Sequence, residues 1–348
     1  MKTVISIVFL TACIANAMGA WPISVDMDCH QSVSFLGCSF GFLNADDDEY
    51  YLLQRNTPLE GLNSPFVQVS LNEAPLQYEG RYVYRTPPSK DEYILLKPGQ
   101  RVAASVRIND IFSLHSDGLY DIKYNKPLQV LSKDEMGLGM KGSEVEVSES
   151  VSIYLENVHL FSSPVREPVG QEEGNIVHIE SCTLAVYIGG TKKERSDTTA
   201  AHKKLCAGFD KVKAKVRNDK NYTTWFGAHT ASRANKVKGV YQKCRDGISQ
   251  NTVTYNIKPS NCKSNWYAYT YHNSRTVFLC NIYFRDPVAC RTSGTSKEGT
   301  LVHEWTHAFG LTEDYAYGKT NVKNLAKSHP DRAVDNAETY EFYYCRSK

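Results

Sequence analysis

The segment LVHEWTH, residues 301–307, is the part of this 348-residue sequence that most restricts its structure. Apolar side chains around it recur at helical spacing, so we expect a helix over residues 299–309. On a helix, His303 and His307 are one turn apart, which places both imidazoles on one face, where they can hold one Zn²⁺. Glu304 is next to the first histidine and can polarise a water molecule at that metal. The alternative is an amphipathic helix whose two histidines are solvated or satisfied within a core.

A catalytic zinc ion needs a third protein ligand and an open fourth position. Gly310 lies three residues after His307 and is expected to end the helix with a left-handed turn that folds the chain back toward the metal. Two carboxylates follow, Glu313 and Asp314. The residues by themselves leave both as candidates for the third ligand.

The whole stretch HEWTHAFGLTEDYAYG, residues 303–318, resembles the aspzincin metalloendopeptidases, which comprise the deuterolysins and the peptidyl-Lys metalloendopeptidases. The resemblance covers about residues 176–348. Likeness to the lysine-specific branch is carried by residues 222–227, 268–271, 276–280 and 299–304. The N-terminal half is similar to the propeptide of that branch, though more loosely.

The resemblance implies a role for each residue of the motif. Asp314 would be the third zinc ligand beside His303 and His307, with one Zn²⁺ per catalytic domain. Glu304 would be the general base that takes a proton from the zinc-bound water. Tyr317 would donate its hydroxyl to the tetrahedral oxyanion, where a neutral donor stabilises charge that develops only in the transition state. The implied fold is an α+β, zincin-like domain built around the HExxH helix.

Two further carboxylates suggest a substrate preference. Glu338 and Glu341 are three residues apart in a helix expected over residues 330–344, so both can converge on one cation. In the lysine-specific branch, the matching positions carry acidic residues that grip a lysine ammonium on the primed side. The resemblance therefore implies cleavage on the N-terminal side of lysine. The alternative is a solvated helix face.

Two other functions stay open at this stage. The first is a general, deuterolysin-like endopeptidase without strict lysine preference. The second is a non-catalytic secreted binding protein in which the N-terminal half is the functional module. The intact set of motif residues favours the protease.

The N-terminus has the features of a secretory signal peptide over residues 1–20. Lys2 supplies the positive charge, residues 4–12 form an apolar run too short to span a membrane, and small residues follow. We therefore expect a secreted, extracellular protein with no membrane-spanning segment.

Short apolar runs separated by turn signals continue from about residue 21 to residue 161, which is typical of an antiparallel β-sandwich. The expected domains are residues 21–165 as the β-sandwich, residues 166–175 as a linker and residues 176–348 as the catalytic domain. Strand-like runs occur at residues 66–71, 82–84, 93–96, 101–108, 120–124 and 145–155. In the catalytic domain we expect helices at 197–217, 229–244 and 330–344, and strands at 266–271 and 276–280.

The near-neutral net charge of +2 conceals two halves of opposite sign. Residues 1–174 carry a net charge of −10 and residues 175–348 a net charge of +12. We expect the chain to be a zymogen whose acidic half is a propeptide associated with the basic half. A cut within residues 162–178 would release the active form. The expected partners are this propeptide and lysine-containing proteins or peptides. We expect no binding to nucleic acid or to a membrane.

Ten cysteines in a secreted chain favour disulfides. Cys13 falls in the signal peptide, so nine remain and one thiol is left over. Cys29 and Cys38 are expected to pair, and the family resemblance implies a bond between Cys262 and Cys280. Asn221 begins the only glycosylation sequon, Asn-Tyr-Thr.

Overall fold

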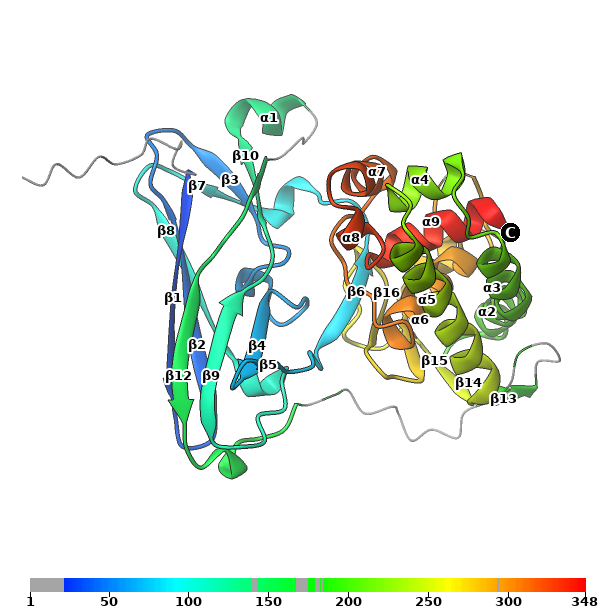
Figure 1. Ribbon diagram of the computed structural model, residues 1–348, viewed down its shortest axis with the longest axis horizontal. Coiled ribbons are helices and arrows are strands. Elements are labelled where there is room, and N and C mark those ends of the chain that lie inside the picture. The colour runs from blue at the N-terminus through cyan, green and yellow to red at the C-terminus, as the bar shows by residue number, and fades with distance from the viewer. Residues whose placement is uncertain are drawn as a thin grey trace, which may run out of the picture.

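The computed structural model describes residues 22–138, 143–164, 166, 175–178, 182, 184–292 and 294–348. The expected signal peptide at 1–20 and most of the expected linker lie outside the described residues. The described chain has a strand-rich N-terminal half and a helix-rich C-terminal half, which lie side by side (Figure 1). This is the mixed α+β composition that the sequence predicts.

The N-terminal half contains three sheets whose strands all pair antiparallel. Along β9, every second residue is buried, as expected where one face of a sheet covers a core. Phe40, Leu52 and Ile122 come from the three different sheets and belong to one buried cluster. The sheets are β1 (Ile23–Gln31), β2 (Leu36–Asn44) and β8 (Arg101–Arg107); β3 (Tyr50–Leu53), β7 (Tyr93–Leu96), β10 (Leu128–Ser132) and β11 (Ser143–Val145); and β4 (Val67–Leu71), β5 (Ala74–Pro75), β9 (Gly118–Tyr124) and β12 (Ser150–Leu155). The role of this half as a separate, removable domain stays a prediction.

The C-terminal half is built on a six-stranded sheet in the order β13-β14-β15-β17-β16-β6. Its strands β14, β15 and β17 pair in parallel, and the other pairings are antiparallel. The edge strand β6 comes from the N-terminal half and lies beside β16 (Figure 1). The sequence groups residues 82–84 with the N-terminal sheets, but the structure pairs this strand with the other half. The bounds are β6 (Arg81–Arg85), β13 (Asn175–His178), β14 (Leu184–Ile188), β15 (Val253–Ile257), β16 (Trp266–Tyr271) and β17 (Thr276–Leu279).

Helices cover this sheet, and α6 (Lys297–Ala308) is buried along its whole length. Ser296 caps α6 by accepting a hydrogen bond from the backbone N–H of Gly299 at 3.0 Å. The helix expected at 197–217 is two helices, and the last expected helix breaks at 334–336, where the Asn336 side chain accepts hydrogen bonds from two backbone N–H groups of the 313–318 loop. The other helices are α1 (Lys133–Leu138), α2 (Lys192–His202), α3 (Leu205–Ala214), α4 (Lys220–Phe226), α5 (Ala231–Gln250), α7 (Lys319–Ser328), α8 (Pro330–Ala333) and α9 (Ala337–Ser347). Short 3-10 helices occur at Pro58–Glu60, Lys90–Glu92, Ile108–Asp110, Val158–Leu160 and Tyr283–Arg285.

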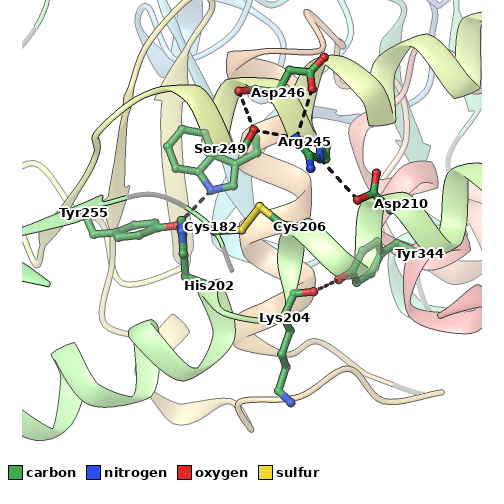
Figure 2. Close-up of a disulfide and its surroundings, with 11 residues drawn as sticks. Cys182, His202, Lys204, Cys206, Asp210, Arg245, Asp246, Ser249, Tyr255 and Tyr344 are labelled. Carbon is green, nitrogen blue, oxygen red and sulfur yellow. Dashed lines mark hydrogen bonds and ion pairs between the residues drawn. A yellow bond between two sulfur atoms is a disulfide. The ribbon is translucent and has the colours of Figure 1, made fainter. Parts of the chain in front are cut away.

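A buried polar chain joins α6 to α2 through Tyr255 of strand β15. Trp305 of α6 donates its indole N–H to the hydroxyl of Tyr255 at 3.1 Å, and that hydroxyl lies 2.6 Å from Nδ1 of His202. Figure 2 shows Tyr255 beside His202, close to the disulfide between Cys182 and Cys206. Burial lowers the pKa of His202 to about 4, so this imidazole is neutral at physiological pH.

The cysteine predictions are confirmed where the residues are described. Cys29 bonds to Cys38, and Cys262 bonds to Cys280. Two further disulfides join Cys182 to Cys206 and Cys290 to Cys345. Among the described cysteines, Cys244 has a free thiol. Burial raises the pKa of this thiol, so Cys244 is an unreactive core residue.

Two predictions about surfaces can be compared with the structure. The sequon residue Asn221 lies in α4, where its side-chain amide donates to the Ser347 hydroxyl at 2.7 Å, and its glycosylation stays a prediction. Across the ranges that the structure describes, no helix has the length and apolar character needed to cross a bilayer.

Candidate active site

Helix α6 holds His303 and His307 on one face, as their spacing predicts. The two Nε2 atoms are 3.1 Å apart, and neither side chain is exposed. The Nδ1 atom of His307 lies 2.6 Å from the carbonyl oxygen of Thr312, to which it can donate. That bond fixes the ring and leaves Nε2 with a free lone pair, the arrangement usual for a histidine that binds a metal.

The chain returns to these histidines through a tight turn after α6. The left-handed residue in this turn is Leu311, with φ of 59°, and not Gly310 as expected from the sequence. Gly310 is required for another reason, because a Cβ atom there would lie 2.6 Å from the carbonyl oxygen of Thr306. The turn places Asp314 opposite the two imidazoles.

His303, His307 and Asp314 each direct one ligand atom to a common point, and these atoms lie within 4.8 Å of one another. The two Asp314 oxygens are 3.4 Å from Nε2 of His303 and 3.2 Å from Nε2 of His307. One Asp314 oxygen and both oxygens of Glu304 are buried without a hydrogen-bond partner. Two imidazole nitrogens and one carboxylate oxygen are a donor set that fits Zn²⁺, and the unpartnered Glu304 carboxylate belongs to the residue next to His303.

Glu313, the alternative ligand, faces away from this cluster. Its carboxylate accepts hydrogen bonds from the Tyr82 hydroxyl at 2.8 Å and from Nζ of Lys126 at 3.2 Å. Burial alone would raise the pKa of Glu313, but the Lys126 ammonium, His272 and the hydrogen bond from Tyr82 together outweigh it, so the pKa is lowered. Of the two adjacent carboxylates, Asp314 is therefore the one that meets the histidines.

The two central carboxyl groups have opposite electrostatics. Burial raises the pKa of Asp314, but the nearby His307 and His303 lower it well below its ordinary value. Burial, reinforced by the charges of Asp314 and Glu341, raises the pKa of Glu304 well above its ordinary value. Such a difference between neighbouring groups is typical of a pair that divides charge stabilisation and proton transfer.

Tyr317 lies beside the cluster and contacts the backbone of β6. Its hydroxyl donates to the carbonyl oxygen of Val83 at 3.0 Å. The ring of Tyr84 stacks on His303 with centroids 4.0 Å apart, and the ring of Tyr82 stacks on His307 at 4.7 Å. The edge strand thus lies directly over the two histidines.

Glu338 and Glu341 lie in α9, beside Tyr317. Both line a cavity of about 300 Å³ together with Tyr84, Tyr267 and Tyr317. Glu338 accepts from the backbone N–H of Gly318 at 2.6 Å and from the Tyr84 hydroxyl at 3.4 Å. Burial raises the pKa of Glu341 to about 8. The two carboxylates meet in a pocket, so the alternative of a solvated helix face is wrong.

Sequence reasoning missed the residues that reach this site from other parts of the chain. Tyr82, Tyr84 and Lys126 belong to the N-terminal half, and no motif marks them. His272 carries no motif either, and it stacks on Tyr82 with centroids 4.1 Å apart. The pairing of β6 with β16 brings Tyr82 and Tyr84 to the site, and Lys126 reaches it from the segment between β9 and β10.

Comparison with known proteins places the C-terminal half among peptidases. Residues 211–345 match the family described as lysine-specific metallo-endopeptidase. The chain is similar to an extracellular protease of Aeromonas hydrophila, with 28% identity over 296 residues, covering 81% of this chain and 80% of that protein. It is also similar to a peptidyl-Lys metalloendopeptidase of Pleurotus ostreatus, with 38% identity over 127 residues, covering 35% of this chain and 71% of that protein. Among solved structures, a zinc peptidase from Grifola frondosa matches 45% of this chain and 97% of its own, with 29% identity and a TM-score of 0.41.

Proposed function

We propose that this chain, which belongs to the aspzincin family of metalloendopeptidases, is a secreted zinc endopeptidase that cleaves on the N-terminal side of lysine. The observation that carries the proposal is the hydrogen bond from the Tyr317 hydroxyl to the Val83 carbonyl, at 3.0 Å. A peptide carbonyl is held by the side chain expected to bind the oxyanion. It lies beside the three residues that fit a metal.

His303, His307 and Asp314 would hold the zinc ion. When bound there, zinc would supply a positive charge that polarises the substrate carbonyl and lowers the pKa of water. The fixed ring of His307 and the buried Asp314 carboxylate supply a rigid set of ligands, because neither has room to turn away.

Glu304 would transfer the proton. It accepts a proton from the attacking water and returns it to the nitrogen of the leaving amine as the peptide bond breaks. Its oxygens have no hydrogen-bond partner in the described structure, so the carboxylate is free for this exchange. Tyr317 donates to the carbonyl oxygen, where negative charge grows in the transition state.

The acidic pocket supports the lysine preference. Tyr317 binds the carbonyl of Val83, and the next residue, Tyr84, directs its own hydroxyl to Glu338. A substrate residue at the place of Tyr84 would direct its side chain between Glu338 and Glu341, where a lysine ammonium meets two carboxylates. The alternative is an endopeptidase of the same mechanism without strict lysine preference.

The N-terminal half would act as an inhibitory propeptide of a zymogen. Strand β6 is added to the sheet beside β16 and covers the histidines, which is the way an extended peptide binds a sheet edge. While β6 is in place, a substrate cannot occupy the same edge. The signal-like N-terminus, and similarity to a protein named extracellular protease, support secretion.

The test is to digest an unstructured protein with the zinc-loaded chain after its linker has been cut, and to sequence the product ends. We expect new N-termini that begin with lysine. Products without lysine enrichment would contradict the specificity and leave the protease assignment intact. The absence of any cleavage, and of stoichiometric zinc, would favour the non-catalytic binding protein.

A further inference from the structure

The strand β6 shows where each residue of a bound peptide would lie. The carbonyl of Val83 is held by Tyr317, and the side chain of Tyr84 reaches Glu338. The bond between Val83 and Tyr84 therefore has the place of a scissile bond. Because side chains alternate along a strand, Tyr82 lies on the same side as Tyr84, one pocket away from the lysine pocket.

The pocket of Tyr82 ends in a carboxylate. The Tyr82 hydroxyl donates to one oxygen of Glu313 at 2.8 Å, and its ring lies between His272 and His307. The imidazole of His272 is itself held by the carbonyl oxygen of Thr312, 3.1 Å from Nε2. The walls of this pocket are therefore flat rings, and its end is an acceptor with a negative charge.

An ammonium group already occupies the other side of the same carboxylate. Nζ of Lys126 lies 3.2 Å from the second oxygen of Glu313, 3.3 Å from the carbonyl oxygen of Asp314 and 4.3 Å from the centroid of the Tyr315 ring. Only 1% of the Lys126 side chain is exposed. The buried ammonium group is therefore bound by a carboxylate, a carbonyl oxygen and an aromatic face, all of which attract a cation.

Both partners of Glu313 come from the N-terminal half. Among the ion pairs of the described residues, no lysine or arginine of the C-terminal half is paired with Glu313. Arg332 of the C-terminal half has its guanidinium 5.7 Å from the Tyr315 ring and pairs with Glu146. Removal of the N-terminal half would therefore take away both the Tyr82 hydroxyl and the Lys126 ammonium from the Glu313 carboxylate.

We propose that Glu313, with His272 and Tyr315, forms a second specificity subsite that binds a cationic substrate side chain. The substrate position is that of Tyr82, so the preferred segment is basic-Xaa-Lys, cut before the lysine. A long basic side chain and a tyrosine have similar reach, which allows the cationic group to take the place of the Tyr82 hydroxyl. This inference rests on the proposed function, because it takes its register from a peptide cut at the zinc site.

The experiment uses two peptides that differ in one neutral replacement, Ala-Arg-Ala-Lys-Ala and its analogue with citrulline in place of arginine. The zinc-loaded full chain, cut in its linker with both fragments present, is assayed for kcat/KM on each. We expect about a tenfold preference for the arginine peptide, from one charge-assisted contact. Any fragment that stays docked competes equally with both peptides, so the ratio is unaffected.

The same pair is measured by calorimetry on the cut Glu304→Gln chain, which needs no turnover. We expect the arginine peptide to bind about tenfold more tightly, and the ratio to fall to near one in Glu313→Gln. Asp331→Asn removes an exposed carboxylate of the same half and should keep the preference. Equal affinities, or no measurable binding of the arginine peptide, would overturn the subsite. Failure of the proposed function would appear differently, as no cleavage of either peptide.

Discussion

The hydroxyl of Tyr317 lies 3.0 Å from the carbonyl oxygen of Val83, although 234 positions separate the two residues. This contact joins the strand-rich half to the helix-rich half at the point where the chemistry is expected. It also defines which peptide bond of β6 has the place of a substrate bond.

Glu304→Gln should lower kcat by a factor of about 10² to 10⁴, because the amide cannot accept the proton of the attacking water. Zinc content should stay stoichiometric, since Glu304 does not belong to the cluster of ligand atoms. Turnover is measured on the cut chain and metal by mass spectrometry. Substantial residual cleavage would exclude Glu304 as the base.

Asp314→Asn and Glu313→Gln separate the two candidate ligands. Asp314→Asn should lose zinc to a chelator at concentrations that leave the parent loaded, because a neutral amide replaces a ligand carboxylate. Glu313→Gln should keep its zinc, since its oxygens bind Tyr82 and Lys126. The measurement is zinc retained during chelator titration. Loss of zinc from Glu313→Gln alone would reverse the assignment.

Tyr84→Lys should convert the inhibitory strand into a substrate. A lysine ammonium at this place would lie between Glu338 and Glu341, and the adjacent carbonyl is already held by Tyr317. We expect the full chain to cut itself between positions 83 and 84, which N-terminal sequencing would detect. Tyr84→Phe is the matched control and should remain intact. An uncut Tyr84→Lys chain, in a preparation that cleaves added lysine peptides once its linker is cut, would refute the register.

Lys126→Met should loosen the N-terminal half. The substitution keeps the length of the side chain but removes the charge that meets Glu313, at a cost of about 2 kcal/mol, which corresponds to roughly 30-fold weaker association. After the linker is cut, less of the N-terminal fragment should co-elute with the rest. Lys133→Met, which removes a mostly exposed surface pair with Glu49, is the control. Equal co-elution in both variants would contradict the importance of Lys126.

Stability should fall in acid because of His202. Its pKa is about 4 in the folded chain and 6.5 ordinarily, so the unfolded chain binds more protons between these values. The contribution of neutral His202 is complete above pH 6.5 and is lost as the pH falls toward 4, by about 2 kcal/mol between pH 7 and pH 5. His202→Gln should flatten this part of the pH dependence, as denaturant unfolding at the two pH values would measure. An unchanged slope would show that His202 is not responsible.

Local rules predicted much of the chain, because they act between residues that are near in sequence. The spacing of His303 and His307 determined that both share one helix face, and the alternating runs before residue 161 indicated antiparallel strands. The short separation of Cys29 and Cys38 was enough to predict their bond. Helix ends were less predictable: Leu311 takes the left-handed conformation expected for Gly310, because close contact with α6 decides the turn.

Only the tertiary structure decided how the site is completed and covered. The residues alone left both Glu313 and Asp314 as candidates, and the direction of each carboxylate depends on a turn and on Lys126 from the other half. The covering strand β6 is a short apolar run like the other strands of its half, so nothing in its sequence shows that its partner is β16. Which edge a strand joins is determined by packing between residues far apart along the chain, and no local pattern records that choice.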